Sequence, residues 1–64
     1  MRLTPRERSA LLIIYNRGFA DLRKVSEQYR QGLIDLGMRE PPLIEVDADR
    51  VTLTDAGRQA ASRS

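Results

Sequence analysis

Apolar and polar residues alternate over residues 51–54, and residues 43–46 are apolar except for one glutamate. Such patterns are typical of half-buried strands, whose successive side chains point to opposite faces of a sheet. With residues 48 and 49 at the centre of a turn, the two strands pair as a β-hairpin. The facing pairs are then Val46 with Val51 and Ile44 with Leu53, all on one face, with Glu45 and Thr52 on the other.

The opening residues carry a strong signal for the start of a helix. Thr4 suits the N-cap position, Pro5 suits the first helical position, and Glu7 stands three residues after the cap. This is a capping box, in which each of the two side chains binds the other residue's backbone N–H. We expect a helix that runs through Tyr15 and ends near Gly18, a residue type common at helix C-termini.

Five consecutive apolar residues, Leu11–Tyr15, lie in this helix. They cannot all share one stripe of a helix with 3.6 residues per turn, and Leu12 and Ile13 widen the face that the other three form. The helix is therefore either nearly surrounded by the chain or offers a second apolar surface to a partner. Because so short a chain favours oligomerisation, we expect Leu12 and Ile13 in a homodimer interface.

A second helical region is predicted over Phe19–Leu36, because apolar residues recur there every three or four positions. Gly32 lies inside this region and marks either a break or a close approach to the first helix. Gly37 is expected to end the helix, and Pro41–Pro42 then force an extended backbone before the hairpin. Thr54 is a good N-cap for a short last helix. These elements predict a single α+β domain over residues 1–64, in the order helix, helix, strand, strand, short helix.

Composition excludes several kinds of chemistry. The chain has no cysteine and no histidine, which argues against disulfides, zinc sites and Ser-His or Cys-His catalysis. We see no nucleophile–base pair and no Gly-rich phosphate loop, and we expect neither an enzyme nor a cofactor. No apolar run approaches the ~20 residues that cross a bilayer and no signal peptide is visible, so we expect a cytoplasmic protein without membrane contact.

Charge is distributed unevenly along the chain. Residues 1–39 carry eight basic and four acidic groups, whereas residues 40–64 carry three basic and five acidic groups. Ten of the eleven cations are arginine, whose planar fork suits phosphates and base edges. Coding bias towards arginine is the alternative explanation. The basic first part of the chain is compatible with a nucleic-acid partner.

Three segments carry a resemblance to a known family. Leu3–Arg8, followed by an apolar helix, is similar to the opening of many bacterial regulator DNA-binding domains. Asp47–Arg58 resembles the wing and following helix of MarR-type repressors, which read as Asp-x-x-Arg, a strand, and Leu-Thr-x-x-Gly-Arg. Leu33–Met38 resembles the tail of a recognition helix. The chain thus resembles a winged helix-turn-helix domain of bacterial or phage regulators, which implies a small winged-helix-like fold and DNA binding.

One segment departs from this family. A full winged helix has a further helix and a turn before its recognition helix. If the recognition helix begins near Val25 or Ser26, only Phe19–Lys24 remain for both, which is too few. The domain is then a minimal variant, or residues 20–36 form one continuous helix without a helix-turn-helix.

The exposed part of the second helical region supplies the candidate DNA contacts. Arginine reads guanine and glutamine reads adenine in the major groove, while cations at a helix start meet phosphates. The alternative is an ordinary solvated helix face. The predicted DNA-binding residues are Arg23, Lys24, Ser26, Gln28, Arg30 and Gln31.

The predicted hairpin is acidic, whereas wings that touch DNA carry cations. Glu45, Asp47 and Asp49 surround Arg50, and their carboxylates repel phosphate. The hairpin therefore either stays off DNA or binds a basic partner. An Asp-rich turn is common without any bound ion, and we expect no metal here.

Two functions remain open from the sequence. The first is a small double-stranded-DNA-binding protein, a transcriptional regulator that acts as a homodimer. The second is a protein–protein interaction module, a small subunit or inhibitor built on a winged-helix-like scaffold. The basic residues 1–39 and the regulator-like ends favour the first function. The acidic hairpin and the missing helix favour the second.

Overall fold

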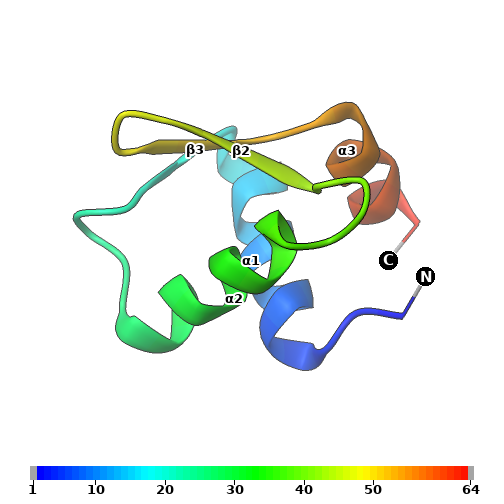
Figure 1. Cartoon of the computed structure of the whole chain (residues 1–64), viewed down its shortest axis with the longest axis horizontal. Coiled ribbons are helices and arrows are strands. Elements are labelled where there is room, and N and C mark those ends of the chain that lie inside the picture. The colour runs from blue at the N-terminus through cyan, green and yellow to red at the C-terminus, as the bar shows by residue number, and fades with distance from the viewer. Residues whose placement is uncertain (1, 64) are drawn as a thin grey trace.

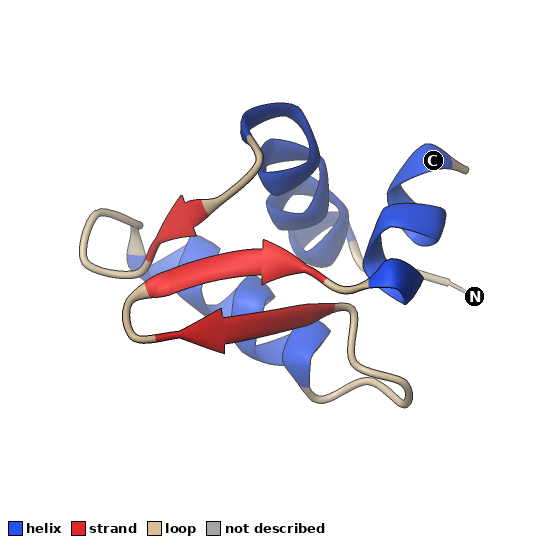
Figure 2. Cartoon of the chain, turned by 90° about the horizontal axis from the view of Figure 1, so that it is seen from above, coloured by secondary structure: helices blue, strands red, loops and turns tan. Residues whose placement is uncertain are grey.

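Three helices and three strands succeed one another along residues 2–63, the part of the chain that the computed structural model describes (Figure 1). They are α1 (Pro5–Arg17), β1 (Ala20–Asp21), α2 (Glu27–Gly37), β2 (Ile44–Asp47), β3 (Arg50–Leu53) and α3 (Asp55–Ser62). The strands form one antiparallel sheet in the order β1-β3-β2, and α1 and α2 lie against one face of it (Figure 2). The predicted α+β class and the predicted order of helices and hairpin strands are confirmed, and β1 is an additional strand.

The predicted capping box opens α1. The Thr4 hydroxyl accepts a hydrogen bond from the Glu7 N–H at 3.1 Å, and the Glu7 carboxylate accepts one from the Thr4 N–H at 3.0 Å. Pro5 is the first helical residue. Gly18 ends the helix with φ at 92°, the left-handed conformation that glycine adopts without steric cost. Both predicted ends of this helix are confirmed.

The helix predicted over Phe19–Leu36 is wrong in its first part, because α2 begins only at Glu27. Ala20 pairs with Val51 in the sheet, and this tertiary pairing outweighs the local helical period. The side chain of Asp21 then accepts a hydrogen bond from the Arg23 N–H at 2.9 Å, a local turn that competes with helix formation. Residues 20–36 are therefore not one continuous helix.

The second helix proper starts at a cap of its own. Ser26 is the N-cap of α2, and its hydroxyl accepts a hydrogen bond from the Tyr29 N–H at 3.2 Å. The helix ends at Gly37 as expected, and Met38 after it is 79% exposed. No second helix stands between α1 and α2, since residues 22–25 form only a turn.

The hairpin has the predicted register, with Val46 opposite Val51 and Ile44 opposite Leu53. Three of these side chains are buried, whereas Val46 on the edge strand is 54% exposed. The two-residue turn requires a positive φ at its first centre, and Ala48 adopts φ 57°. This conformation is costly for a residue with a Cβ atom.

Two glycines mark close approaches of backbone in the core. A Cβ atom at Gly32 would lie 2.9 Å from the Arg6 carbonyl oxygen, so α1 and α2 touch there, which is the second of the two roles expected for this glycine. A Cβ atom at Gly57 in α3 would overlap the Leu43 carbonyl oxygen. Around these contacts lie the fully buried side chains Leu11, Ile14, Leu33, Leu36, Leu43 and Val51.

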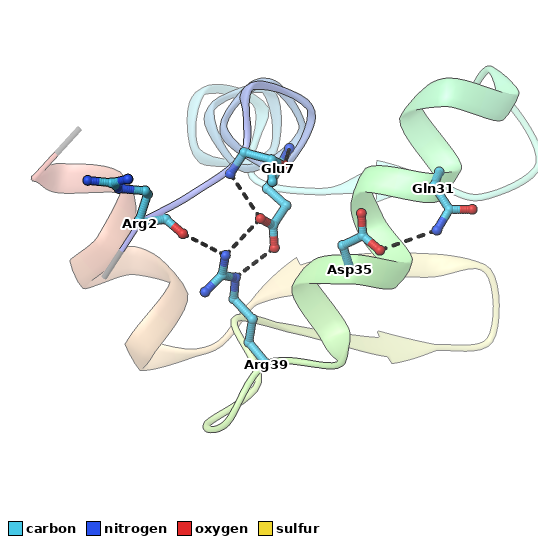
Figure 3. A network of polar contacts seen from close by, with 6 residues as sticks. Arg2, Glu7, Gln31, Asp35 and Arg39 are labelled. Carbon is cyan, nitrogen blue, oxygen red and sulfur yellow. Dashed lines mark hydrogen bonds and ion pairs between the residues drawn. The ribbon is translucent and has the colours of Figure 1, made fainter.

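A partly buried ion pair joins the start of α1 to the segment after α2 (Figure 3). The Arg39 guanidinium donates to both carboxylate oxygens of Glu7, at 2.6 and 2.8 Å. It also donates to the Arg2 carbonyl oxygen at 2.7 Å. Glu7 is 3% exposed, and the hydrogen bond from Arg39 lowers the pKa of Glu7 to about 2 despite the opposing effect of burial.

Acid is expected to destabilise the fold through Glu7. Because the folded-state pKa is about 2 against an ordinary value of 4.5, the carboxylate stabilises the fold fully above about pH 5. This contribution is lost as the pH falls towards 2 and is on the order of 2–3 kcal/mol. Urea unfolding at a series of pH values should show a smaller acid-dependent loss for Glu7→Gln than for the wild type. Glu40→Gln, the control at an exposed carboxylate that makes no ion pair within residues 2–63, should keep most of the loss. Equal slopes in wild type and Glu7→Gln would contradict the assignment.

Two glycine substitutions are expected to act in opposite directions. Gly57→Ala should lower the free energy of unfolding by about 1–3 kcal/mol or more, because the new methyl group meets the backbone of Leu43. Gly37→Ala should raise it by about 0.5 kcal/mol, because its Cβ atom would find ordinary contacts at 3.7 and 3.8 Å and alanine favours helix. Thermal unfolding followed by circular dichroism measures both, and equal effects would show that the α3 contact is looser than described.

Candidate functional site

Cations from three parts of the chain gather around the N-terminal end of α2. Lys24 lies in the turn before the helix, and Arg17 is the last residue of α1. The Arg30 guanidinium donates to the Leu22 carbonyl oxygen at 2.8 Å, so this side chain folds back from α2 towards the turn. The N-terminus of a helix carries a partial positive charge, which adds to the field of these side chains. The arrangement favours an anion.

A groove of about 380 Å³ lies beside this helix end. Its lining combines the cations Arg17 and Lys24 with the apolar side chains of Ile13, Phe19 and Val25, and Ser26 and Tyr29 complete its wall. None of the ion pairs within residues 2–63 involves Arg17 or Lys24. Both charges are therefore available to a ligand.

Arg23 has a different role from the neighbouring cations. Its Nε lies 3.5 Å from the Asp21 carboxylate and 3.4 Å from the Asp49 carboxylate. The Leu22 N–H donates to the Asp49 carbonyl oxygen at 2.8 Å, which ties the same turn to the hairpin. Arg23 therefore neutralises two carboxylates of the chain. Arg23 also keeps the pKa of Asp21 below its ordinary value, mainly through the hydrogen bond from its backbone N–H and also through its side chain.

The predicted contact residues of α2 point in different directions. Successive helix residues are about 100° apart, so Gln28 and Arg30 lie on opposite flanks with Gln31 between them. Gln28 lines a second groove together with Arg6 and Ser9 of α1. The Gln31 amide donates to the Asp35 carboxylate at 3.2 Å (Figure 3). Of the six predicted residues, Lys24 and Ser26 line the same groove, and Arg30 reaches back to the turn before α2.

Tyr29 belongs to the packing between the two long helices. Its hydroxyl donates to the Ala10 carbonyl oxygen at 3.4 Å, and burial raises the pKa of Tyr29. Ser26 likewise has a structural partner, since it caps α2. The hydrogen bond from Tyr29 to Ala10 holds the start of α2 against α1.

The two predicted interface residues are in unequal positions. Leu12 packs against the core of its own chain. Ile13 is 37% exposed and lines the groove beside Lys24. Most residues of α1 are exposed, so the chain does not surround this helix, and Ile13 is the member of the pair that lies open to a partner.

Sequence reasoning missed the exposed apolar residues of α2. Ile34 and Met38 are 48% and 79% exposed and stand one helical turn apart, away from the core. Their spacing is visible in the sequence, because both fall outside the stripe of Tyr29, Leu33 and Leu36. Phe19 is 44% exposed, and the Arg50 guanidinium lies 4.7 Å from its ring centre, a cation–π contact that no spacing could indicate.

The acidic hairpin lies close to the basic surface, because Asp49 in its turn pairs with Arg23. Within residues 2–63 no three aspartate or glutamate side chains are grouped as ligands for a cation. Glu45 and Asp47 are exposed, and Asp49 pairs with Arg23. No helix in the same range is both long and apolar enough to cross a bilayer.

Comparison of the chain with models of known protein families, with curated proteins and with solved structures gives no match. The resemblance to winged helix-turn-helix domains therefore stays a prediction.

Proposed function

We propose that the protein binds double-stranded DNA as a homodimer and acts as a transcriptional regulator. The observation that carries the proposal is the group of cations at the N-terminal end of α2. Arg17, Lys24 and Arg30 come from α1, the turn and α2, and all three side chains are exposed. Exposed cations at a helix N-terminus suit the phosphate backbone of a duplex.

Local neutralisation supports this assignment. The carboxylates of Asp21 and Asp49 lie next to the basic surface, but Arg23 pairs with both of them. The repulsion that these carboxylates would exert on phosphate is thereby reduced. In this proposal Arg23 shields the surface, whereas Lys24 and Arg17 meet phosphates.

Base contacts fall to the first turns of α2. Gln31 lies between the flanks of the helix, and its amide suits an adenine edge once it leaves Asp35. Arg30 keeps further N–H groups for a phosphate or a guanine while one of them stays on Leu22. The acidic hairpin takes no part in DNA contact.

Lys24→Ala is expected to weaken binding to all duplexes alike. It removes one phosphate contact, so the slope of log affinity against log salt should flatten by about 1, and Arg17→Ala/Lys24→Ala by about 2. Fluorescence anisotropy of a labelled random duplex across a salt series measures this slope. Arg58→Ala, which removes a cation that pairs with Asp55 on α3, is the control and should leave the slope unchanged.

The wild-type titration can overturn the proposal by itself. Phosphate contacts are strongest at low salt, and about 50 mM is low enough for a protein with several of them. Absence of salt-sensitive binding under that condition would remove the DNA function and leave the basic side chains as solvated surface.

A second candidate function is a protein-interaction module, and the exposed pair Ile34 and Met38 favours it. Large apolar side chains one turn apart on an outer helix face are typical of a helix that docks on a partner, and methionine adapts easily to such surfaces. Under this function the anisotropy titration with duplex DNA should show no binding. Ile34→Lys and Met38→Lys should then abolish partner binding while changing the free energy of unfolding by less than about 0.5 kcal/mol, as at other exposed positions.

A further inference from the structure

The groove at the start of α2 continues along α1. A second groove, of about 440 Å³, is lined by Arg6 and Ser9 of α1 and by Gln28 of α2. Ser26 and Tyr29 line both grooves. Because α1 and α2 pack side by side (Figure 1), the two grooves form one continuous depression between α1 and the first turn of α2. We call this depression the interhelix groove.

One face of α1 borders the interhelix groove over most of the length of the helix. The exposed residues of α1 in the lining are Arg6, Ser9, Ile13 and Arg17. They are three or four positions apart, which is the spacing of one helix face. Arg6 and Arg17 are separated by three helical turns, or roughly 17 Å along the helix axis, and they point in nearly the same direction. The interhelix groove therefore has a cation at each end.

The lining of the interhelix groove is basic. Arg6, Arg17 and Lys24 are exposed, and none of them takes part in an ion pair within residues 2–63. Asp21 is the one carboxylate among the lining residues, and its charge is paired with that of Arg23. The interhelix groove thus offers three cations to a ligand along the length of a helix.

A row of anions fits this geometry better than a single anion. Cations at the two ends of a groove roughly 17 Å long cannot both reach one phosphate group. Each strand of duplex DNA carries a phosphate about every 3.4 Å of helix axis, so a groove of this length faces several phosphates at once. Hydroxyl and amide side chains, here Ser9 and Gln28, are also common donors to phosphate oxygens.

We infer that the interhelix groove binds the phosphate backbone of one DNA strand along α1, with Arg6 as the contact at the end far from Lys24. The inference rests on the proposed function and adds Arg6 and Ser9 to its contacts. The DNA contact is then not confined to the N-terminal end of α2 but extends over three turns of α1.

Two arginines of α1 provide a matched pair of variants. Arg6 and Arg8 are both exposed and take part in no ion pair within residues 2–63. Arg8 lies on the other side of α1, where it lines a groove with α3. Arg6→Gln and Arg8→Gln remove the same charge, and glutamine keeps the Cγ atom that Arg6 places near Gly32.

Fluorescence anisotropy of a labelled random duplex across a salt series compares the two variants. Arg6→Gln should flatten the slope of log affinity against log salt by about 1, whereas Arg8→Gln should leave it unchanged. The triple variant Arg6→Gln/Arg17→Gln/Lys24→Gln should flatten it by about 3. A wild-type slope in Arg6→Gln, or the same change in Arg6→Gln and Arg8→Gln, would overturn the inference.

A variant that gains a contact separates the effect from partial misfolding. Ser9→Arg places a further cation in the interhelix groove between Arg6 and Arg17 and should steepen the slope by about 1. Gln59→Arg adds the same charge on α3 and should not change the slope. Circular dichroism checks that each variant is folded. An unchanged slope in folded Ser9→Arg speaks against the contact along α1.

The same titrations separate this inference from the proposed function. If Lys24→Ala flattens the slope and Arg6→Gln does not, DNA binding stands and its extension along α1 is wrong. If the wild type shows no salt-sensitive binding at about 50 mM salt, both are wrong.

Discussion

The pair of Glu7 and Arg39 is the constraint on which the arrangement of the helices depends. Glu7 is the buried charged residue of residues 2–63, and its carboxylate serves the N-cap of α1 and the guanidinium of Arg39 at once. Arg39 in turn holds the Arg2 carbonyl oxygen. A buried charge left without its partner is strongly unfavourable, so the pair fixes where the chain leaves α2 relative to the start of α1. The contact of Gly32 with Arg6 then sets the distance between the two helices.

What could be predicted from the sequence is local. The capping box at Thr4 and Glu7 and the register of the hairpin each follow from residues close together in the chain, and both are confirmed. The strand β1 has only two residues and no period of its own, and it exists because β3 offers it a partner. The partner of Glu7 lies 32 residues away, which no spacing rule can indicate.

The candidate site shows the same division. The predicted residues around Ser26 do lie at the start of a helix, because the cap is a local signal. Which of them are available to a ligand depends on tertiary contacts. Arg23 forms an ion pair with Asp49 in the hairpin turn. Arg17 was not among the predicted residues, yet it lines the same groove as Lys24. Because Arg23 pairs with Asp21 and Asp49, the charges of Arg17 and Lys24 are not used by these carboxylates, and the surface stays basic beside an acidic hairpin.

The central claim is that the surface at the N-terminal end of α2 contacts duplex DNA. Nuclear magnetic resonance on ¹⁵N-labelled protein, titrated with a short duplex at low salt, tests it most directly. The account predicts that the amide resonances of Arg17, Lys24 and Gln31 shift with the DNA concentration, while those of Ile34 and Met38 do not. Shifts confined to Ile34 and Met38, or no shifts at all, would contradict it.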